Sequence, residues 1–199
     1  MTKLLTICIP TVMGREEKCE RLVKNIDKQI LEGDYDAFVE VIIDRDNKEV
    51  SIGVKRDRMY KNSTSLFTVQ IDDDDNIPED YIKTFFDNFD ADVDCYGYIE
   101  LCTFDNTTKK LSDFSIKHKK WYETRYPLNG FHHFRTPFCK CPIKTSICQQ
   151  VGVQDFRFSE DHDFAIRIYP FLKKEKYISK VMYLYQYTSE NFNSKYGIK

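Results

Sequence analysis

Four adjacent aspartates, Asp72 to Asp75, follow the apolar run 66–71, which predicts a β-strand. Adjacent carboxylates repel one another, so the cluster costs free energy unless a cation lies among them. Hard oxygen ligands of this kind suit Mg²⁺ or Mn²⁺, which complete their shells with water and phosphate oxygens. Ligands of α/β sheets bind at the carboxyl ends of strands, which favours a metal–diphosphate site over a solvated acidic loop.

A second acidic group, residues 159–163, precedes an apolar helical pattern and predicts a helix start. Acids in the first turn of a helix are stabilised by its dipole, so they need no chemical function there. His132, His133 and three nearby cysteines suggest zinc, but their spacing is not that of a standard zinc finger. Core or surface cysteines are therefore the favoured interpretation.

The composition favours one globular domain. The chain has 199 residues, with only seven Gly and six Pro, so a long flexible linker is not expected. No apolar run reaches the ~18 residues that span a bilayer, and residues 1–13 lack the features of a signal peptide. Seven Cys at irregular spacings do not suit a disulfide framework, which favours a reducing compartment such as the cytoplasm.

Hydrophobic periodicity predicts strands and helices that would position these residues. The expected strands cover 4–9, 39–43, 66–71, 93–104 and 181–187, and the expected helices cover 15–31, 51–60, a segment after Pro78 and a segment from 159. Pro10-Thr11 and residues 44–47 are expected to end the first two strands. The order of the first half is typical of a nucleotide-binding α/β unit. Residues 107–147 show no clean period, and the tail from Ser189 is predicted to be polar and frayed.

Five segments, in this order, are similar to motifs of nucleotide-sugar glycosyltransferases of the GT-A fold, in particular the family 2-like group. They are residues 7–11, 41–44, 53–57, 71–75 and 159–167. The third departs from the family pattern, because Asp57 stands where Asn is usual. The resemblance, over about 4–90 and 150–187, implies a Rossmann-like, three-layer α/β/α fold with a mostly parallel central sheet. It implies one domain over 1–199, in which about 1–105 bind the nucleotide-sugar and about 106–199 the acceptor.

The resemblance also implies roles for the acidic cluster. Asp74 would ligate Mn²⁺ or Mg²⁺, and Asp72 would contact the metal or the nucleotide ribose, with Asp75 as a substitute. A divalent ion there would neutralise the departing diphosphate. The other residues expected to bind the donor, most simply a UDP-sugar, are Pro10, Thr11, Arg15, Asp44, Lys55 and Arg56. For Lys55 and Arg56, a solvated helix face is the alternative.

By the same resemblance, Asp161 would take the proton of the acceptor hydroxyl, with Glu160 as runner-up. Attack from the face opposite the leaving group would invert the anomeric carbon, while plain helix capping is the alternative role for these acids. His133 would complete the shell of the catalytic metal, since some GT-A enzymes use a late His in this way.

The acceptor is less constrained by the sequence. The net charge is −2, but residues 107–146 hold nine Lys/Arg and two Asp/Glu, a local charge of +7. This basic, aromatic segment (107–147) favours a nucleic acid, and a hydroxymethylated DNA base modified in the host cytoplasm by a phage-type enzyme is the leading hypothesis. A saccharide, lipid or protein acceptor is the alternative, and so is a non-catalytic module that only binds a sugar nucleotide.

Overall fold

The structure is a computed structural model and describes residues 3–188. The strands are β1 (Leu5–Val12), β2 (Val39–Asp46), β3 (Phe67–Gln70), β4 (Cys95–Phe104), β5 (Thr108–Phe114), β6 (Tyr122–Leu128), β7 (Phe131–Arg135), β8 (Ile143–Lys144) and β9 (Glu175–Tyr187). The helices are α1 (Glu16–Gly33), α2 (Ile52–Asn62), α3 (Tyr81–Asp87), α4 (Thr145–Val151) and α5 (Glu160–Ile168), followed by the 3-10 turn η1 (Tyr169–Phe171). The predicted tail from Ser189 lies outside the described residues.

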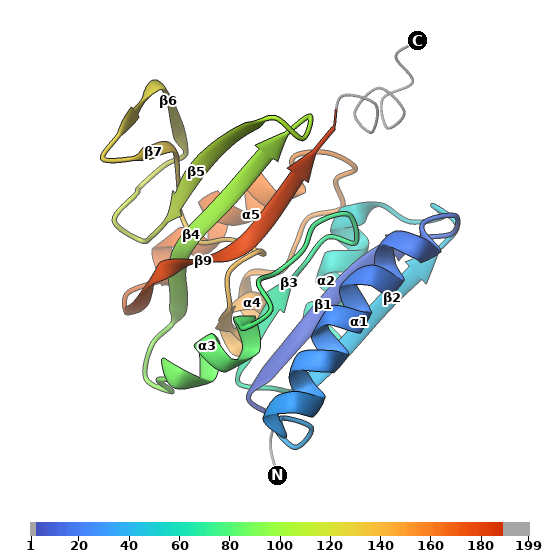
Figure 1. The fold of residues 1–199 in the computed structure, drawn as a ribbon. Helices are drawn as coiled ribbons and strands as arrows, with labels where there is room; N and C mark the ends of the chain where they lie inside the picture. The colour runs from blue at the N-terminus through green and yellow to red at the C-terminus, as the bar shows by residue number, and fades with distance from the viewer. Residues whose placement is uncertain (1–2, 189–199) are drawn as a thin grey trace.

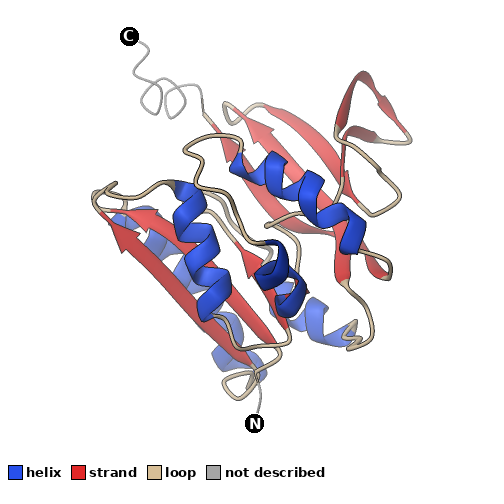
Figure 2. Cartoon of the chain, turned by 180° about the vertical axis from the view of Figure 1, so that it is seen from behind, coloured by secondary structure: helices blue, strands red, loops and turns tan. Residues whose placement is uncertain are grey.

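The strands form one sheet in the order β2-β1-β3-β8-β4-β5-β7-β6, with β9 paired to β4. Strands β1, β2 and β3 are parallel, as are β4 and β9, whereas β8 runs antiparallel to both of its neighbours. Helices α1 and α3 contact each other on one face, and α2, α4 and α5 pack together on the other (Figures 1 and 2). The predicted three-layer α/β/α fold with a parallel core is therefore confirmed.

The first half matches the predicted elements closely. Helix α1 buries Cys19, Leu22 and Ile26, which share one face because they lie three and four residues apart. It ends where predicted, since Asp34 takes the left-handed conformation of a helix C-terminus at φ 55°. No helix within residues 3–188 is long and apolar enough to cross a bilayer.

Strand β1 is longer than predicted, because Pro10-Thr11 does not end it. Strand β3 pairs with β1 only as far as Cys8, and beyond that point only β2 continues the ladder. Pro10 therefore lies where one side of the strand is open, and a missing N–H is tolerated at such an edge. Strand β2 likewise continues through Asp44 to Asp46.

The second half contains strands that periodicity did not reveal. Strands β5 and β7 are parallel, and β6 pairs antiparallel with β7 at the end of the sheet. Most side chains of β6 are exposed, so its sequence lacks the alternation of apolar and polar residues that marks a half-buried strand. Strand β9 begins six residues before the predicted 181, at Glu175.

Candidate active site

The four aspartates at the end of β3, here called the acidic corner, divide into two pairs. The side chains of Asp72 and Asp74 are 28% and 31% exposed, whereas that of Asp73 is 2% exposed. Nη2 of Arg15 lies 2.6 Å from both Asp73 Oδ1 and Asp74 Oδ2, and the Thr11 hydroxyl donates to Asp73 at 2.6 Å. Burial nevertheless raises the pKa of Asp73 to about 6. The corner thus presents two partly exposed carboxylates on a buried base.

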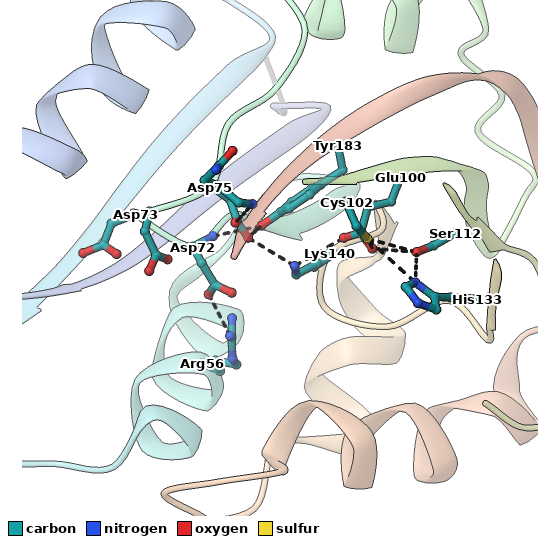
Figure 3. A network of polar contacts seen from close by, with 12 residues as sticks. Arg56, Asp72, Asp73, Asp75, Glu100, Cys102, Ser112, His133, Lys140 and Tyr183 are labelled. Atoms are coloured by element: carbon teal, nitrogen blue, oxygen red, sulfur yellow. Dashed lines mark hydrogen bonds and ion pairs between the residues drawn. The ribbon is translucent and has the colours of Figure 1, made fainter. Parts of the chain in front are cut away.

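Asp75 points into the protein instead (Figure 3). Its carboxylate accepts from the Tyr183 hydroxyl at 2.8 Å and from the Gln186 N–H at 3.0 Å, and it pairs with Lys140 Nζ at 3.1 Å. Burial raises the pKa of Asp75, and Lys140 offsets part of that shift. Asp75 therefore fixes β9 to the corner. It was expected to be able to substitute for Asp74, but its carboxylate does not lie on the exposed side of the corner.

Arg56 on α2 joins the acidic corner to α5. Its Nη2 donates to Asp72 Oδ1 at 2.8 Å, its Nε to Glu160 Oε1 at 3.1 Å, and its Nη1 to Gln70 Oε1 at 3.0 Å. Burial alone would lower the pKa of Arg56, but these acids hold it well above its usual value. The Arg56 guanidinium was predicted to support the diphosphate, but its N–H groups bind side chains of the protein. Through these contacts it brings together Asp72 and Glu160, two of the predicted site residues.

Helix α2 also holds the loop that leads into α5. The Gly53 N–H donates to the Phe156 carbonyl at 3.1 Å, and a Cβ at Gly53 would lie only 2.0 Å from the Gln154 carbonyl oxygen. The Asp57 carboxylate accepts from the Val153 N–H at 3.0 Å. The segment that resembles Gly-x-x-Arg-Asn therefore contacts this loop and α5 through all three of its distinctive residues.

The residues expected to contact the nucleoside lie together at the ends of β1 and β2. Pro10 is the register partner of Asp44 on the neighbouring strand. Arg58 binds the Asp44 carboxylate with two hydrogen bonds, of 2.7 Å and 2.6 Å. A ribose that used Asp44 would have to share it with this exposed guanidinium.

Lys55 is buried and points to the same ends. Its ammonium group pairs with Asp46 and donates to the Thr11 carbonyl. Lys55 thereby ties α2 to both strands, and it lies among the predicted donor-binding residues rather than on the solvated helix face that was the alternative.

Asp161 lies on α5 and lines a cavity of about 340 Å³. The opposite side of the cavity comes from β4 to β7, and aromatic rings of Trp121, Phe138 and Tyr185 also face it. Burial raises the pKa of Glu160, which faces Arg56. The structure thus separates the two acids: Asp161 reaches the cavity, and Glu160 reaches the corner.

A polar network, here defined as Glu100, Cys102, Ser112, His133 and Lys140, lines the cavity (Figure 3). His133 Nδ1 lies 3.1 Å from the Ser112 hydroxyl, and burial lowers the pKa of this histidine. The contacts that connect His133 to the acidic corner run through Glu100 and Lys140. The structure does not bring His133 to Asp72 and Asp74, and the described part of the chain holds no group of three His, Cys, Asp or Glu able to hold a metal.

The sequence interpretation missed Glu100, Tyr183 and above all Lys140. Burial alone would lower the pKa of Lys140, but Asp75 and Glu100 hold it well above its usual value. The local signal was present, because Lys140 stands between Cys139 and Cys141 in an otherwise apolar segment. A lysine inside an apolar run is rarely buried without a charged partner.

The order of the elements is that of the GT-A, Rossmann-like fold. The structure is similar to solved structures of S. aureus TarS, a glycosyltransferase with this fold. For TarS 1-349 the TM-score is 0.61 at 17% identity, covering 96% of this chain and 63% of that one. Its complexes with UDP and with UDP-GlcNAc both give 0.59, at 14% and 13% identity, over 96% and 92% of this chain.

The chain therefore spans about three fifths of the length of TarS 1-349, with 63% and 58% of it covered. No family model matches the sequence, and no curated protein matches it. At these identities the likeness concerns the fold.

Proposed function

We propose that the chain is a glycosyltransferase that moves a sugar from a nucleotide-sugar, most simply a UDP-sugar, to an acceptor hydroxyl. The observation that carries the proposal is the Arg56 bridge, which joins Asp72 at the end of β3 to Glu160 at the start of α5. A leaving-group site and a base must lie on either side of one anomeric carbon, and this bridge holds their two elements at one place. The TarS complexes with UDP and UDP-GlcNAc support the choice of donor.

The donor-binding half would be about residues 1–105. Pro10, Thr11 and Asp44 would surround the nucleoside, and Arg15, now paired with two aspartates, would move to the diphosphate because phosphate offers the same bidentate partner as carboxylate. Lys55 would hold Thr11 in place and Arg56 would hold Asp72 in place, each through a hydrogen bond and without contacting the donor itself.

The acidic corner fits Mn²⁺ or Mg²⁺ by the chemistry of its donors. Asp72 and Asp74 are partly exposed carboxylates, and these ions commonly take one or two carboxylates and complete the shell with substrate phosphates and water. When bound, the ion would neutralise charge on the departing nucleoside diphosphate. Asp73 and Asp75 would hold the loop in shape from below.

Asp161 would accept the proton of the attacking hydroxyl. It lines the cavity, it is partly exposed, and it lies beside Glu160, whose carboxylate is already engaged by Arg56. A base on the cavity side, opposite the leaving diphosphate, predicts inversion at the anomeric carbon.

The acceptor-binding half would be about residues 106–199. Part of its positive charge is neutralised within the protein, because Arg135 pairs with Glu123 and Lys117 with Asp113. Lys109, Lys119 and Lys120 are exposed and form no ion pair within residues 3–188. These lysines support a DNA acceptor with a hydroxymethylated base, and gel-shift binding of modified and unmodified DNA at two salt concentrations tests it. If no DNA binds at low salt, a saccharide, lipid or protein acceptor takes its place.

The decisive test of the transferase is nucleotide release from UDP- and GDP-sugars with Mn²⁺, compared with EDTA. We expect release that EDTA abolishes, and we expect Asp72→Asn and Asp74→Asn each to lower it by a factor of about 10³ or more. Thermal unfolding of the Asp74 variant should change little, because this side chain is partly exposed, whereas Asp72→Asn also removes a charge partner of buried Arg56 and should lower stability. Donor binding without turnover would favour the non-catalytic module, and absence of any donor binding would refute the proposal.

A further inference from the structure

The contacts around His133 favour one tautomer of its ring. The Glu100 carboxylate, 3.4 Å from Lys140 Nζ, only accepts hydrogen bonds, and it takes the one hydroxyl proton of Ser112 at 3.0 Å. With that proton on Glu100, the Ser112 oxygen, 3.1 Å from His133 Nδ1, acts as the acceptor, and Nδ1 carries the ring proton. The thiol of Cys102 also donates to Glu100, at 3.1 Å, and leaves its sulfur facing Nδ1 at 3.9 Å. In the neutral ring, Nε2 is then a hydrogen-bond acceptor.

That acceptor nitrogen has no partner among residues 3–188. His133 is only 8% exposed, yet its contacts with hydroxyl and thiol use Nδ1 alone, and its side chain lines the cavity of about 340 Å³. This nitrogen is not among the buried polar atoms that lack a partner, so it is open to the cavity, and a ligand or water that enters there can donate a hydrogen bond to it. Asp161, the proposed base, lines the same cavity and is also an acceptor.

The size and lining of the cavity limit what it can hold. A volume of about 340 Å³ lies at the small end of the range for small-molecule pockets, which suits one ring-sized group. Trp121, Phe138 and Tyr185 contribute aromatic side chains to the lining, while Asp161 and Nε2 of His133 can each accept a hydrogen bond. A group with an apolar face and at least two hydroxyls meets both conditions.

We propose that Nε2 of His133 accepts a hydrogen bond from a second hydroxyl of the acceptor and so turns the reacting hydroxyl toward Asp161. The inference rests on the proposed transferase function and names the chemistry of its acceptor, a group that carries two or more hydroxyls inside the cavity. A hydroxymethylated base carries only one hydroxyl, so the inference favours the saccharide among the proposed acceptors. In this role His133 binds the acceptor, in place of the metal-ligand role implied by the resemblance. The network of Ser112, Glu100 and Lys140 acts through His133 by holding its tautomer.

The first test needs no substrate. Long-range ¹H–¹⁵N spectra of imidazole rings report which nitrogen is protonated, and the chain has only four histidines, so His133→Gln assigns the resonance. We expect a proton on Nδ1 and none on Nε2 at neutral pH. Ser112→Ala removes the acceptor for Nδ1–H and is expected to populate the other tautomer. A ring protonated on Nε2 in the wild-type protein would overturn the proposal.

The second test uses glycerol as the probe, because it is small, carries adjacent hydroxyls and can be added at high concentration. Glycerol is expected to shift the Nε2 resonance, and its trimethyl ether, which accepts but does not donate, is expected to leave it unchanged. Equal shifts with glycerol and its trimethyl ether would refute donation from a hydroxyl group. A shift with free 5-hydroxymethylcytosine and none with glycerol would refute the acceptor with two or more hydroxyls.

A matched pair of variants separates this inference from the function on which it rests. The side-chain amide of Gln reaches the position of Nε2, whereas that of Asn reaches only the position of Nδ1. With a working acceptor, His133→Asn is expected to raise the acceptor KM at least tenfold relative to His133→Gln, with donor affinity unchanged. Unequal donor affinity would contradict the inference, while wild-type protein that binds no nucleotide-sugar would refute the transferase instead.

Discussion

The acidic corner and the polar network are both clusters of charged groups, but they are built in opposite ways. The corner presents Asp72 and Asp74 toward solvent and pairs them with Arg56 and Arg15, of which the partly exposed Arg15 would give way to a cation and a diphosphate. The network is buried, and its one acid, Glu100, pairs with Lys140, which also binds Asp75 of the corner. The difference teaches that an exposed pair of charges suits exchange of ligands, whereas a buried pair suits fixed geometry.

The largest effect is expected from Lys140→Met, which leaves Asp75 and Glu100 buried without a counter-ion. Removing one partner of a buried ion pair costs about 3–5 kcal/mol, and urea unfolding measures this loss. Lys144→Met is the matched control, because Lys144 is 24% exposed and lies 4.0 Å from Asp94. The control should cost less than about 1 kcal/mol. Similar losses for both variants would contradict the distinction between corner and network.

Asp161→Asn should affect rate rather than stability. Loss of a general base lowers kcat by about 10²- to 10⁴-fold, and steady-state nucleotide release with acceptor measures it. The control is Asp163→Asn on the same helix, because Asp163 pairs with Arg167 at 2.7 Å and does not line the cavity. An equal loss in both variants would indicate that α5 had moved, and would remove the argument for Asp161 as the base.

Asp57 tests whether α2 positions the active-site loop. Asp57→Ala removes the hydrogen bond to Val153 N–H and is expected to cost about 1–2 kcal/mol in unfolding free energy. It should also lower kcat, because that loop leads to Glu160 and Asp161. Asp57→Asn keeps an acceptor oxygen, so activity near that of the wild type is expected. A larger loss with Asn than with Ala would exclude the positioning role.

The smallest effects distinguish two buried carboxylates by pH. Burial raises the pKa of Asp73 above its ordinary 3.8 to about 6, so its folded form binds protons more tightly than its unfolded form. Stability should therefore fall as pH rises from about 4 to 6, and Asp73→Asn should remove that fall.

Asp113 has the opposite sign. Burial would raise its pKa, but hydrogen bonds from Lys117, Tyr177 and His118 hold it below 3.8. Its contribution to stability is present above pH 4 and is lost as pH falls through the lowered pKa. Asp113→Asn should therefore cost about 1 kcal/mol of unfolding free energy at pH 7, and it should reduce the decrease in that free energy at acid pH. Urea unfolding between pH 3 and 7 measures the unfolding free energy of both variants. If Asp73 and Asp113 changed the slope of this free energy against pH with the same sign, the prediction would be contradicted.

The sequence by itself determined the parallel core and the position of the acidic corner. Strands β1 and β3 are short apolar runs bounded by polar residues, and only Ile71 separates β3 from Asp72, so local pattern and chain order were sufficient. Neighbouring parallel strands end at one edge, which is why Pro10 and Asp44 could be expected near each other.

Only the tertiary structure decided which aspartates face solvent and what each charged group contacts. Asp73 and Asp75 are indistinguishable from Asp72 and Asp74 in sequence, and their burial depends on Thr11, Lys140 and β9, up to 111 residues away for Gln186. The polar network has no local signature either, because it joins side chains from β4, β5 and β7 with the segment before β8. Such contacts follow from packing between distant elements, and periodicity along one element carries no information about them.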